Sequence, residues 1–334
     1  MENLNSTTIP SLPMKNEGPS QTRKSSSSNL VWSDYIQIAS FACLLTIGAF
    51  MNLISFIYFG FRKTRFKSNY RYFIAHLSFA DLTCCLMTPV FTITVILNNE
   101  QWIFGDIACN YIYPMARLSG SLSAWILCGM TYERYRAFTN PFHKLRKRMI
   151  HIYMVIVYLI YITYSLVYSI HPRSKKHAQC SHSNRSKTVY LNIIKTNIKI
   201  AVPSIIIITL CIRLKIFLRN NNDVINTSNN DTSTGANSHQ NETQTIRVQR
   251  RKDKSEKMVL YSAASYLVCV LPAYVVQIVS CVFILTGQPK YLSNKDIRWA
   301  LIFFYANSVI NVFIYAGRFK DFRKFIFEIL HLSK

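Results

Sequence analysis

The sequence predicts an all-α membrane protein, built as a seven-transmembrane helix bundle with a short amphipathic eighth helix. Half of its 334 residues are hydrophobic and only 16% are charged, whereas soluble domains carry about 25% charged residues. Seven apolar stretches approach or exceed the roughly 20 residues that a helix needs to cross a bilayer. None alternates apolar and polar residues, which favours helices over a β-barrel. The stretches are 35–61, 72–97, 108–132, 149–170, 188–212, 258–286 and 299–316.

The stretches differ in how strongly they predict a membrane span. The first and sixth contain no charged residue and are the strongest. The third and fifth are the weakest by hydropathy alone, because Arg117 interrupts the third, and Lys195 and Lys199 interrupt the fifth.

Three segments differ in composition from the apolar stretches. Residues 1–32 are polar and hold no apolar stretch, so we expect a disordered extracellular tail and no cleavable signal peptide. Within the bundle domain, 33–317, the segment 219–254 is rich in Asn, Ser and Thr, which predicts a disordered third intracellular loop. Residues 318–334 place Phe and Ile at helical spacing with basic residues between them, which predicts a membrane-surface helix and a C-terminal tail.

Charge in the short loops predicts the orientation. Loop 62–71 holds five basic residues and no acid, loop 133–148 holds six against one, and the end 317–334 holds five against two. Loop 98–107 has two acids and no basic residue. Because basic loops stay in the cytoplasm, we expect a multi-pass protein of the plasma membrane with an extracellular N-terminus.

Loop 171–187 departs from this trend, with five basic residues and no acid. We expect its charge to serve function rather than topology. Asn5 and Asn184 begin Asn-x-Ser/Thr triplets on the extracellular side and are the expected glycosylation sites.

Motifs with characteristic spacing follow one another along the spans. They are Gly48-x3-Asn52, Leu77-Ser78-Phe79-Ala80-Asp81-Leu82, Trp102-x-Phe104-Gly105 before Cys109, Glu133-Arg134-Tyr135, Asn140-Pro141-Phe142, and the series Asn307, Asn311 and Tyr315. In this order they resemble the motifs of the rhodopsin-like (class A) G-protein-coupled receptors. The resemblance covers about 33–327 and is closest to the peptide-receptor group of that family.

Four positions depart from the family pattern. The fourth span has no Trp, Val270 replaces the aromatic residue two positions before Pro272, Val312 replaces a proline, and Cys211 replaces a tyrosine. These departures concern the activation switch rather than the fold.

The resemblance implies a receptor that binds an extracellular ligand, a peptide or an anion, and activates heterotrimeric G proteins. An atypical or scavenging receptor with little G-protein signalling is the alternative, supported by the departures just named. A transporter or channel would show repeats or a polar pore, and neither is visible. No nucleophile–base pair or phosphate loop suggests an enzyme. The basic loops are expected to face anionic membrane lipids, not nucleic acid.

A sodium site and a switch are further implications of the family. Asp81 lies in the middle of a span, where an ionisable group is expensive and usually functional. A neutral, hydrogen-bonded Asp81 is the alternative to a sodium ligand. The expected sodium ligands are Asp81, Ser123, Asn307, Ser308 and Asn311, and no other cofactor is expected, because Tyr305 stands where opsins keep the lysine that binds retinal.

The expected switch centres on Arg134, held at rest by Glu133 and exposed to a G protein on activation. Simple anchoring of both side chains at the membrane edge is the alternative. The remaining residues of the expected switch are Tyr135, Asn311, Tyr315 and Glu256, with Glu256 as a substitute for the acid usual on the sixth helix.

The residues expected on the extracellular side predict a disulfide and an anionic ligand. Cys109 and Cys180 are expected to pair, since both face an oxidising compartment. Ala116 replaces the aspartate of amine receptors, so amine ligands are not expected. Buried cations need counter-charge, and the expected ligand contacts are Arg117, Lys195, Lys199 and Arg298. The two lysines could instead extend toward lipid headgroups.

Overall fold

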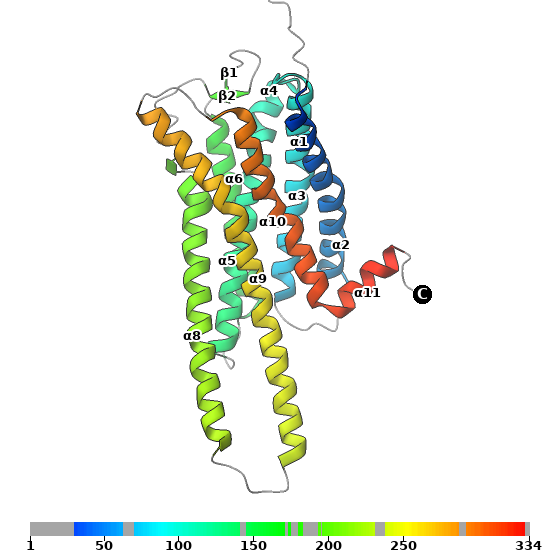
Figure 1. Ribbon diagram of the computed structural model, residues 1–334, viewed down its shortest axis with the longest axis vertical. Helices are drawn as coiled ribbons and strands as arrows, with labels where there is room; N and C mark the ends of the chain where they lie inside the picture. The colour runs from blue at the N-terminus through cyan, green and yellow to red at the C-terminus, as the bar shows by residue number, and fades with distance from the viewer. Residues whose placement is uncertain are drawn as a thin grey trace, which may run out of the picture.

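A computed structural model describes most of the chain (Figure 1). The described residues are 30–62, 70–140, 145–170, 173–174, 180–182, 193–194, 196–230, 238–286 and 292–330. We refer to the two ends of the bundle as the disulfide end, which carries β1 and β2, and the α11 end, which carries the last helix.

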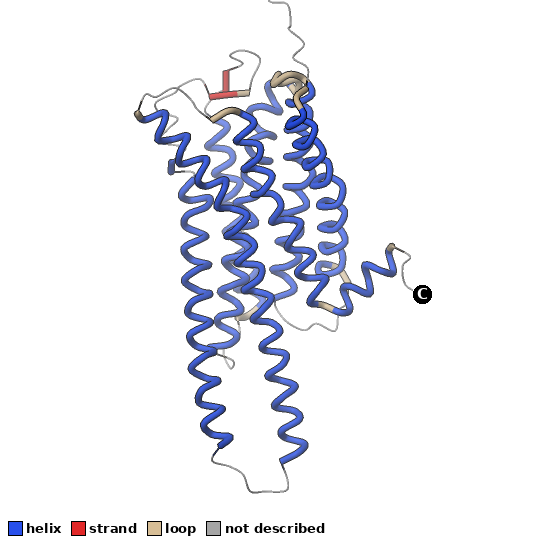
Figure 2. Tube along the Cα trace, viewed as in Figure 1, coloured by secondary structure: helices blue, strands red, loops and turns tan. Residues whose placement is uncertain are grey.

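The described residues form a bundle of seven long helical segments, whose arrangement Figure 2 shows. The first segment is continuous from Trp32 to Gly60 and includes one π-helical turn. The segments are α1 (Trp32–Cys43) with η1 (Leu44–Gly48) and α2 (Ala49–Gly60); α3 (Tyr70–Leu97); α4 (Gly105–Ile107) with η2 (Ala108–Ile112) and α5 (Tyr113–Thr139); α6 (Lys147–Ile170); η4 (Asn197–Ala201) with α8 (Val202–Asn230); α9 (Ser238–Leu285); and α10 (Asn294–Arg318).

Six of these segments, within the described residues, are long and apolar enough to cross a membrane. They are Trp32–Gly60, Tyr70–Leu97, Lys147–Leu166, Asn197–Asn220, Lys257–Phe283 and Asn294–Arg318. The remaining segment, which contains α5, is not apolar enough to be counted, because it carries charged side chains. The weak third stretch of the sequence predicted this. Helix α5 nevertheless packs against α3, α6 and α8, so neighbouring protein shields its polar residues from lipid.

Two glycines of α5 allow close packing around this central helix. A Cβ atom at Gly120 would lie 2.2 Å from the Phe304 ring, and one at Gly129 would lie 2.4 Å from the Tyr153 ring. Carbon atoms prefer separations of about 3.5–4.0 Å. Only glycine therefore lets these rings of α10 and α6 approach the backbone of α5.

The short helix α11 (Lys320–Ile329) follows α10 and lies at an angle to the bundle (Figure 1). Phe322 and Ile326 are its buried residues, and Phe322 packs on Phe59 and Tyr58 of α2, with ring centroids 5.0 and 5.1 Å apart. This confirms the expected eighth helix and its apolar face.

The segment 219–254, for which disorder was predicted, is helical in most of its described residues. Helix α8 continues to Asn230 and α9 begins at Ser238, so both extend beyond the bundle as Figure 1 shows. Only residues 231–237 between them lie outside the described part. Adding residues to an existing helix is much easier than nucleating one, and Gln, Arg, Lys and Glu are good helix formers.

A two-stranded antiparallel sheet lies at the disulfide end, within the basic loop 171–187. Strand β1 (Arg173–Ser174) pairs with β2 (Ser181–His182). Figure 1 shows this hairpin above the ends of the helices. The side chains of the loop's basic residues and the predicted glycosylation sites Asn5 and Asn184 lie outside the described residues.

Candidate functional site

A buried polar cluster surrounds Asp81 in the middle of the bundle. Asp81 is fully buried on α3. Its Oδ1 accepts hydrogen bonds from Ser123 of α5 at 2.6 Å and Ser308 of α10 at 2.9 Å. Asn311 Nδ2 donates to Asp81 Oδ2 over 3.2 Å. The structure thus joins three helices through one carboxylate, and its partners Ser123, Ser308 and Asn311 belong to the set that the resemblance to the family implied.

The donor set of this cluster fits a sodium ion. Hard cations prefer oxygen ligands, and the five predicted residues supply a carboxylate, two hydroxyls and two amides. Among the described contacts, the buried Oδ1 atoms of Asn307 and Asn311 have no hydrogen-bond partner. Buried polar atoms of this kind call for an explanation, and coordination of a cation would provide one.

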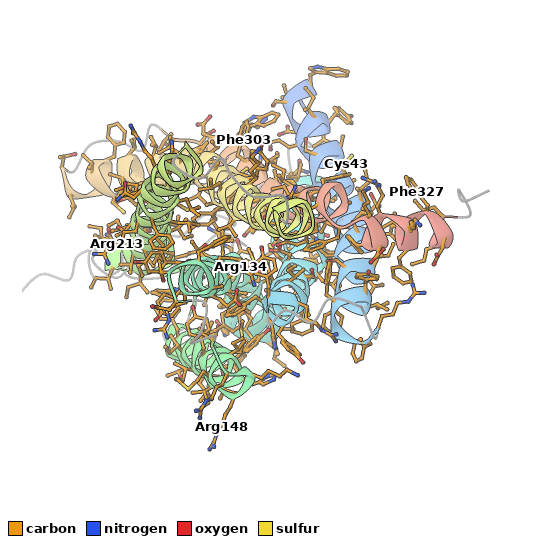
Figure 3. All side chains as sticks on the ribbon, turned by 90° about the horizontal axis from the view of Figure 1, so that it is seen from below. Cys43, Arg134, Arg148, Arg213, Phe303 and Phe327 are labelled. Atoms are coloured by element: carbon orange, nitrogen blue, oxygen red, sulfur yellow. A yellow bond between two sulfur atoms is a disulfide. The ribbon has the colours of Figure 1, made fainter. Side chains whose placement is uncertain are left out.

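A second polar cluster lies toward the α11 end of α5. Arg134 Nε donates to Glu133 Oε2 at 2.6 Å, and the two side chains are only 10% and 7% exposed. The Arg134 guanidinium also lies over the Tyr70 ring, 4.4 Å from its centroid. Seen from below, Arg134 sits among the helices whereas Arg148 projects from the edge (Figure 3). The alternative that both residues merely anchor the membrane edge does not fit this burial.

The remaining residues of the predicted switch are only partly joined to it. Tyr315 is fully buried and packs edge-on against Phe59 at 6.2 Å. Asn311 bonds Asp81 rather than the arginine, and Tyr135 is half-buried. The side chain of Glu256 lies outside the described residues, so its predicted role stays a prediction. No sequence motif marks Tyr70, the aromatic residue at the start of α3 that covers Arg134.

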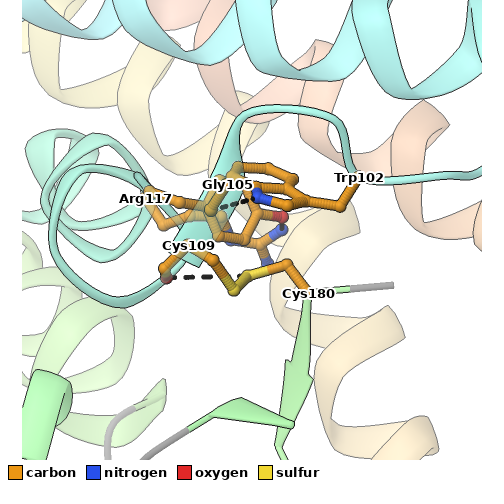
Figure 4. The surroundings of a disulfide bond; sticks show 6 residues. Trp102, Gly105, Cys109, Arg117 and Cys180 are labelled. Carbon is orange, nitrogen blue, oxygen red and sulfur yellow. Dashed lines mark hydrogen bonds between the residues drawn. A yellow bond between two sulfur atoms is a disulfide. The ribbon is translucent and has the colours of Figure 1, made fainter. Parts of the chain in front are cut away.

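The predicted disulfide is confirmed. Cys109 and Cys180 are bonded, with their Cα atoms 5.8 Å apart, and the bond holds the strand β2 against the start of the third segment (Figure 4). Trp102 lies beside the bond and donates from Nε1 to the Gly105 carbonyl at 2.8 Å. The Gly105 backbone has φ +76°, which glycine adopts readily.

A cavity of about 290 Å³ opens beside this disulfide. Its walls come from α3, α5, α10 and the turn between α3 and α4, with Cys180 at its side. The lining residues include Phe91, Trp102, Tyr113, Arg117, Glu100 and Arg298.

The four predicted ligand contacts do not converge on this cavity. Arg117 and Arg298 line it. Lys199 instead donates from Nζ to the Arg117 carbonyl at 2.6 Å and lies 5.1 Å from the centroid of the Phe304 ring. Its side chain therefore points into the bundle rather than toward headgroups. Lys195 lies outside the described residues.

Arg298 forms ion pairs within the protein. This corrects the prediction that its charge is available to a ligand. It donates from Nε to Gln37 Oε1 at 2.6 Å, pairs with Glu100, and lies 3.6 Å from Asp34. Lys295 Nζ also bonds Asp34 Oδ2 at 2.9 Å. We call Asp34, Glu100, Lys295 and Arg298 the outer ion network.

Sequence analysis missed the acids of the outer ion network. Asp34 and Gln37 stand three residues apart in an apolar helix, and that signal could have indicated a shared buried face. Glu100 follows Asn99 in a turn where both have positive φ, 65° and 52°. Such conformations are uncommon outside glycine, and no sequence pattern predicted them.

Fold and clusters together define a multi-pass membrane protein built like a seven-helix receptor. The family model "7 transmembrane receptor (rhodopsin family)" matches residues 30–315. The chain therefore belongs to the rhodopsin-like (class A) G-protein-coupled receptors and is not an enzyme. Squid rhodopsin is structurally similar, with a TM-score of 0.74 over 91% of this chain and 87% of that one, at 18% identity. That likeness supports the fold alone.

Curated relatives match shorter segments. The chain is 31% identical to "Neuropeptide Y receptor type 6" of Mus musculus over 39% of its length. It is 27% identical to "Tachykinin-like peptides receptor 86C" of Drosophila melanogaster over 39%, and 25% identical to "Ultraviolet-sensitive opsin" of Melopsittacus undulatus over 38%. The matches span only 35%, 25% and 36% of those relatives' own lengths.

Proposed function

We propose that this receptor resides in the plasma membrane with its disulfide end outside, binds an extracellular peptide, and activates heterotrimeric G proteins. Two of these relatives are named as peptide receptors. Position 116 on α5 is an alanine, so it lacks the aspartate with which amine receptors of the family bind an amine. The buried Glu133–Arg134 pair at the opposite end of the bundle is the observation that carries the proposal.

The geometry suggests how ligand binding reaches the G protein. A ligand in the cavity beside Cys180 contacts α3, α5 and α10 together, and favours the helix arrangement that it binds best. In the resting arrangement Arg134 is bonded to Glu133 and covered by Tyr70. An outward movement of α9 would expose Arg134 to the G protein. The basic loops on that side would attract anionic lipids of the inner leaflet.

Nucleotide exchange measures this proposal directly. The full-length receptor is tested in lipid nanodiscs with purified G proteins, first without ligand and then with a library of peptides. Arg134→Ala should abolish exchange, because the variant removes the cation that would face the G protein. Arg148→Ala is the matched control, since this exposed arginine at the same end lies away from Arg134 (Figure 3). Exchange that is equal in the Arg134→Ala and parent receptors would refute the mechanism.

We further propose that Asp81 and its partners bind a sodium ion that stabilises the resting receptor. Ser123, Asn307, Ser308 and Asn311 would complete the oxygen ligands. Replacing potassium chloride by sodium chloride at constant ionic strength should raise the Tm of the purified receptor. Asp81→Asn should remove the difference between the two salts, since it removes the negative charge while keeping the shape. An equal response to both salts in the parent receptor would contradict the sodium site.

A scavenging receptor is the second candidate, favoured by Val270 and Val312. Val270 is buried in the core, and Val312 is fully buried on α10. A scavenger would internalise a bound peptide without nucleotide exchange. Uptake of a labelled peptide that proceeds equally in Arg134→Ala cells, without exchange in the parent receptor, would favour this candidate.

A further inference from the structure

The cavity beside the disulfide is lined by an aromatic cluster and by charged side chains. Phe91 stacks on Trp102 with ring centroids 5.4 Å apart, and Tyr113 packs edge-on against both at 5.7 and 5.1 Å. We call these three rings the aromatic wall. Glu100, Arg298 and Arg117 are among the other lining residues. Small-molecule pockets usually measure about 300–1,000 Å³, so about 290 Å³ accommodates one end group rather than a whole peptide.

The outer ion network is already balanced in charge. Its two acids, Asp34 and Glu100, match its two cations, Lys295 and Arg298. The Arg298 side chain is only 7% exposed and directs its donors at Gln37, Glu100 and Asp34. An incoming anion would have to displace a carboxylate to reach Arg298, and would gain little.

Arg117 adds a positive charge to the cavity lining, next to Tyr113 on the same helix. Its Nη1 donates to the Tyr113 hydroxyl at 3.1 Å, and its guanidinium lies 5.7 Å from the Tyr113 ring centroid. Tyr113 therefore orients the side chain, and Figure 4 shows Arg117 close to the Cys109–Cys180 bond. A guanidinium carries five donors in a planar fork, and this fork matches the two oxygens of a carboxylate.

These features select the chemistry of the occupant. Among the described residues that line the cavity, Arg117 is the cation outside the balanced network, and one such cation suits a monoanion better than a phosphate with nearly two charges. The aromatic wall suits an apolar body attached directly to that anion.

We propose that this cavity binds a carboxylate carried on an apolar or aromatic group, with Arg117 as its partner. The proposal rests on the receptor function given above and specifies the ligand's end group. The carboxylate has two sources, the free C-terminal residue of a peptide or a small aryl or alkyl carboxylic acid. A ligand from either source would fit the narrow volume, pack on the aromatic wall and pair with the Arg117 side chain that Tyr113 orients.

Binding of small probes to the purified full-length receptor tests the proposal without any G protein. The probes are N-acetyl-phenylalanine, its amide, and 3-phenylpropanoate. Saturation-transfer NMR and the Tm of the receptor measure the binding of each probe. A probe of this size should bind with a Kd near 1 mM. The acid should bind at least about tenfold more tightly than the amide, because only the acid forms a charge-assisted pair. Preference for N-acetyl-phenylalanine over 3-phenylpropanoate assigns the site to a peptide terminus, and the reverse preference assigns it to a small acid.

Variants locate the binding. Arg117→Gln should weaken acid binding at least about tenfold, and Arg117→Lys should weaken it less, because Lys keeps the charge but loses the fork. Arg148→Gln removes an equal charge from an exposed side chain at the opposite end of the bundle and should leave binding unchanged. If Arg117→Gln fails to fold, the acid–amide comparison on the parent receptor decides.

The assignment would be overturned by equal binding of acid and amide, or by acid binding that Arg117→Gln leaves intact. Absence of acid binding at about 10 mM, well above the expected Kd, would do the same. Failure of nucleotide exchange, by contrast, would remove the proposed signalling function and leave these binding results standing.

Discussion

Replacing Arg298 by Gln should destabilise the disulfide end of the bundle more than any other change in the outer ion network. Arg298 links α10 to Gln37 and Asp34 on α1 and to Glu100 in the turn after α3. The substitution removes the cation from between two acids while keeping a polar side chain of moderate size. Both acids then lose their shared partner at once.

The expected cost follows from what each acid keeps. Removing one member of a buried ion pair costs about 3–5 kcal/mol. Here Asp34 retains Lys295 at 2.9 Å, and Glu100 retains Asn294 at 3.1 Å and is 32% exposed. We therefore expect Arg298→Gln to lower the free energy of unfolding by about 2–3 kcal/mol.

Lys295→Gln is the reference with which the loss of stability in Arg298→Gln is compared. The Lys295 side chain is 41% exposed, and ion pairs with such exposure contribute about 1 kcal/mol or less. The order expected is thus a large loss for Arg298→Gln and a small one for Lys295→Gln. Because Glu100→Gln leaves Arg298 with Asp34 and Gln37, its loss should fall between these two.

Thermal unfolding of the purified receptor measures the order, and a double-mutant cycle isolates the pair. Arg298→Gln should lower the Tm by roughly 3–5 °C. The cycle between Glu100→Gln and Arg298→Gln should give a coupling energy of about 1 kcal/mol or more. Equal Tm losses for Arg298→Gln and Lys295→Gln, or additive effects in the cycle, would refute the assignment of Arg298 to a buried network.

Two further predictions concern packing and the disulfide. Gly120→Ala places a Cβ 2.2 Å from the Phe304 ring and should cost about 1–3 kcal/mol, although Ala alone favours helix by about 1 kcal/mol. Gly317→Ala, which meets nothing within 4 Å, should be neutral or slightly stabilising, and the Tm compares the two. Cys180→Ser opens a covalent loop across 71 residues and should lower stability by about 2–5 kcal/mol. Cys43→Ser, at an exposed cysteine, is its control, and an equal Tm for both variants would contradict the prediction.

The parts of the receptor that follow a local pattern could be predicted from the sequence. Apolar length predicted the spans, and the family's spacing brought Asp81, Ser123, Ser308 and Asn311 to one point, as their hydrogen bonds show. These residues stand at fixed positions on helices whose packing is shared across the family. The resemblance to the family, with the position of each residue on its helix, therefore predicted which of these side chains meet.

The outer ion network depends on features that no local pattern encodes. Arg298 is separated from Gln37 by 261 residues and from Glu100 by 198. Glu100 reaches it only through a turn with two consecutive positive φ angles. Counting cations on the extracellular side therefore overestimated the charge available to a ligand, because the acids that neutralise Arg298 come from distant segments.

The fourth span shows how the bundle is held without the family's tryptophan. Three tyrosines of α6 form hydrogen bonds to neighbouring helices: Tyr153 to the Trp125 carbonyl at 2.6 Å, Tyr161 to the Met115 carbonyl at 2.7 Å, and Tyr158 with His76 Nδ1 at 3.3 Å. Each such bond contributes about 1 kcal/mol, so the three together tie α6 to α5 and α3. Val270 and Val312 differ from this case, since valine forms no side-chain hydrogen bond and, unlike proline, does not kink a helix. If α9 and α10 move as proposed above, the nucleotide-exchange measurement tests whether these two valines limit the movement.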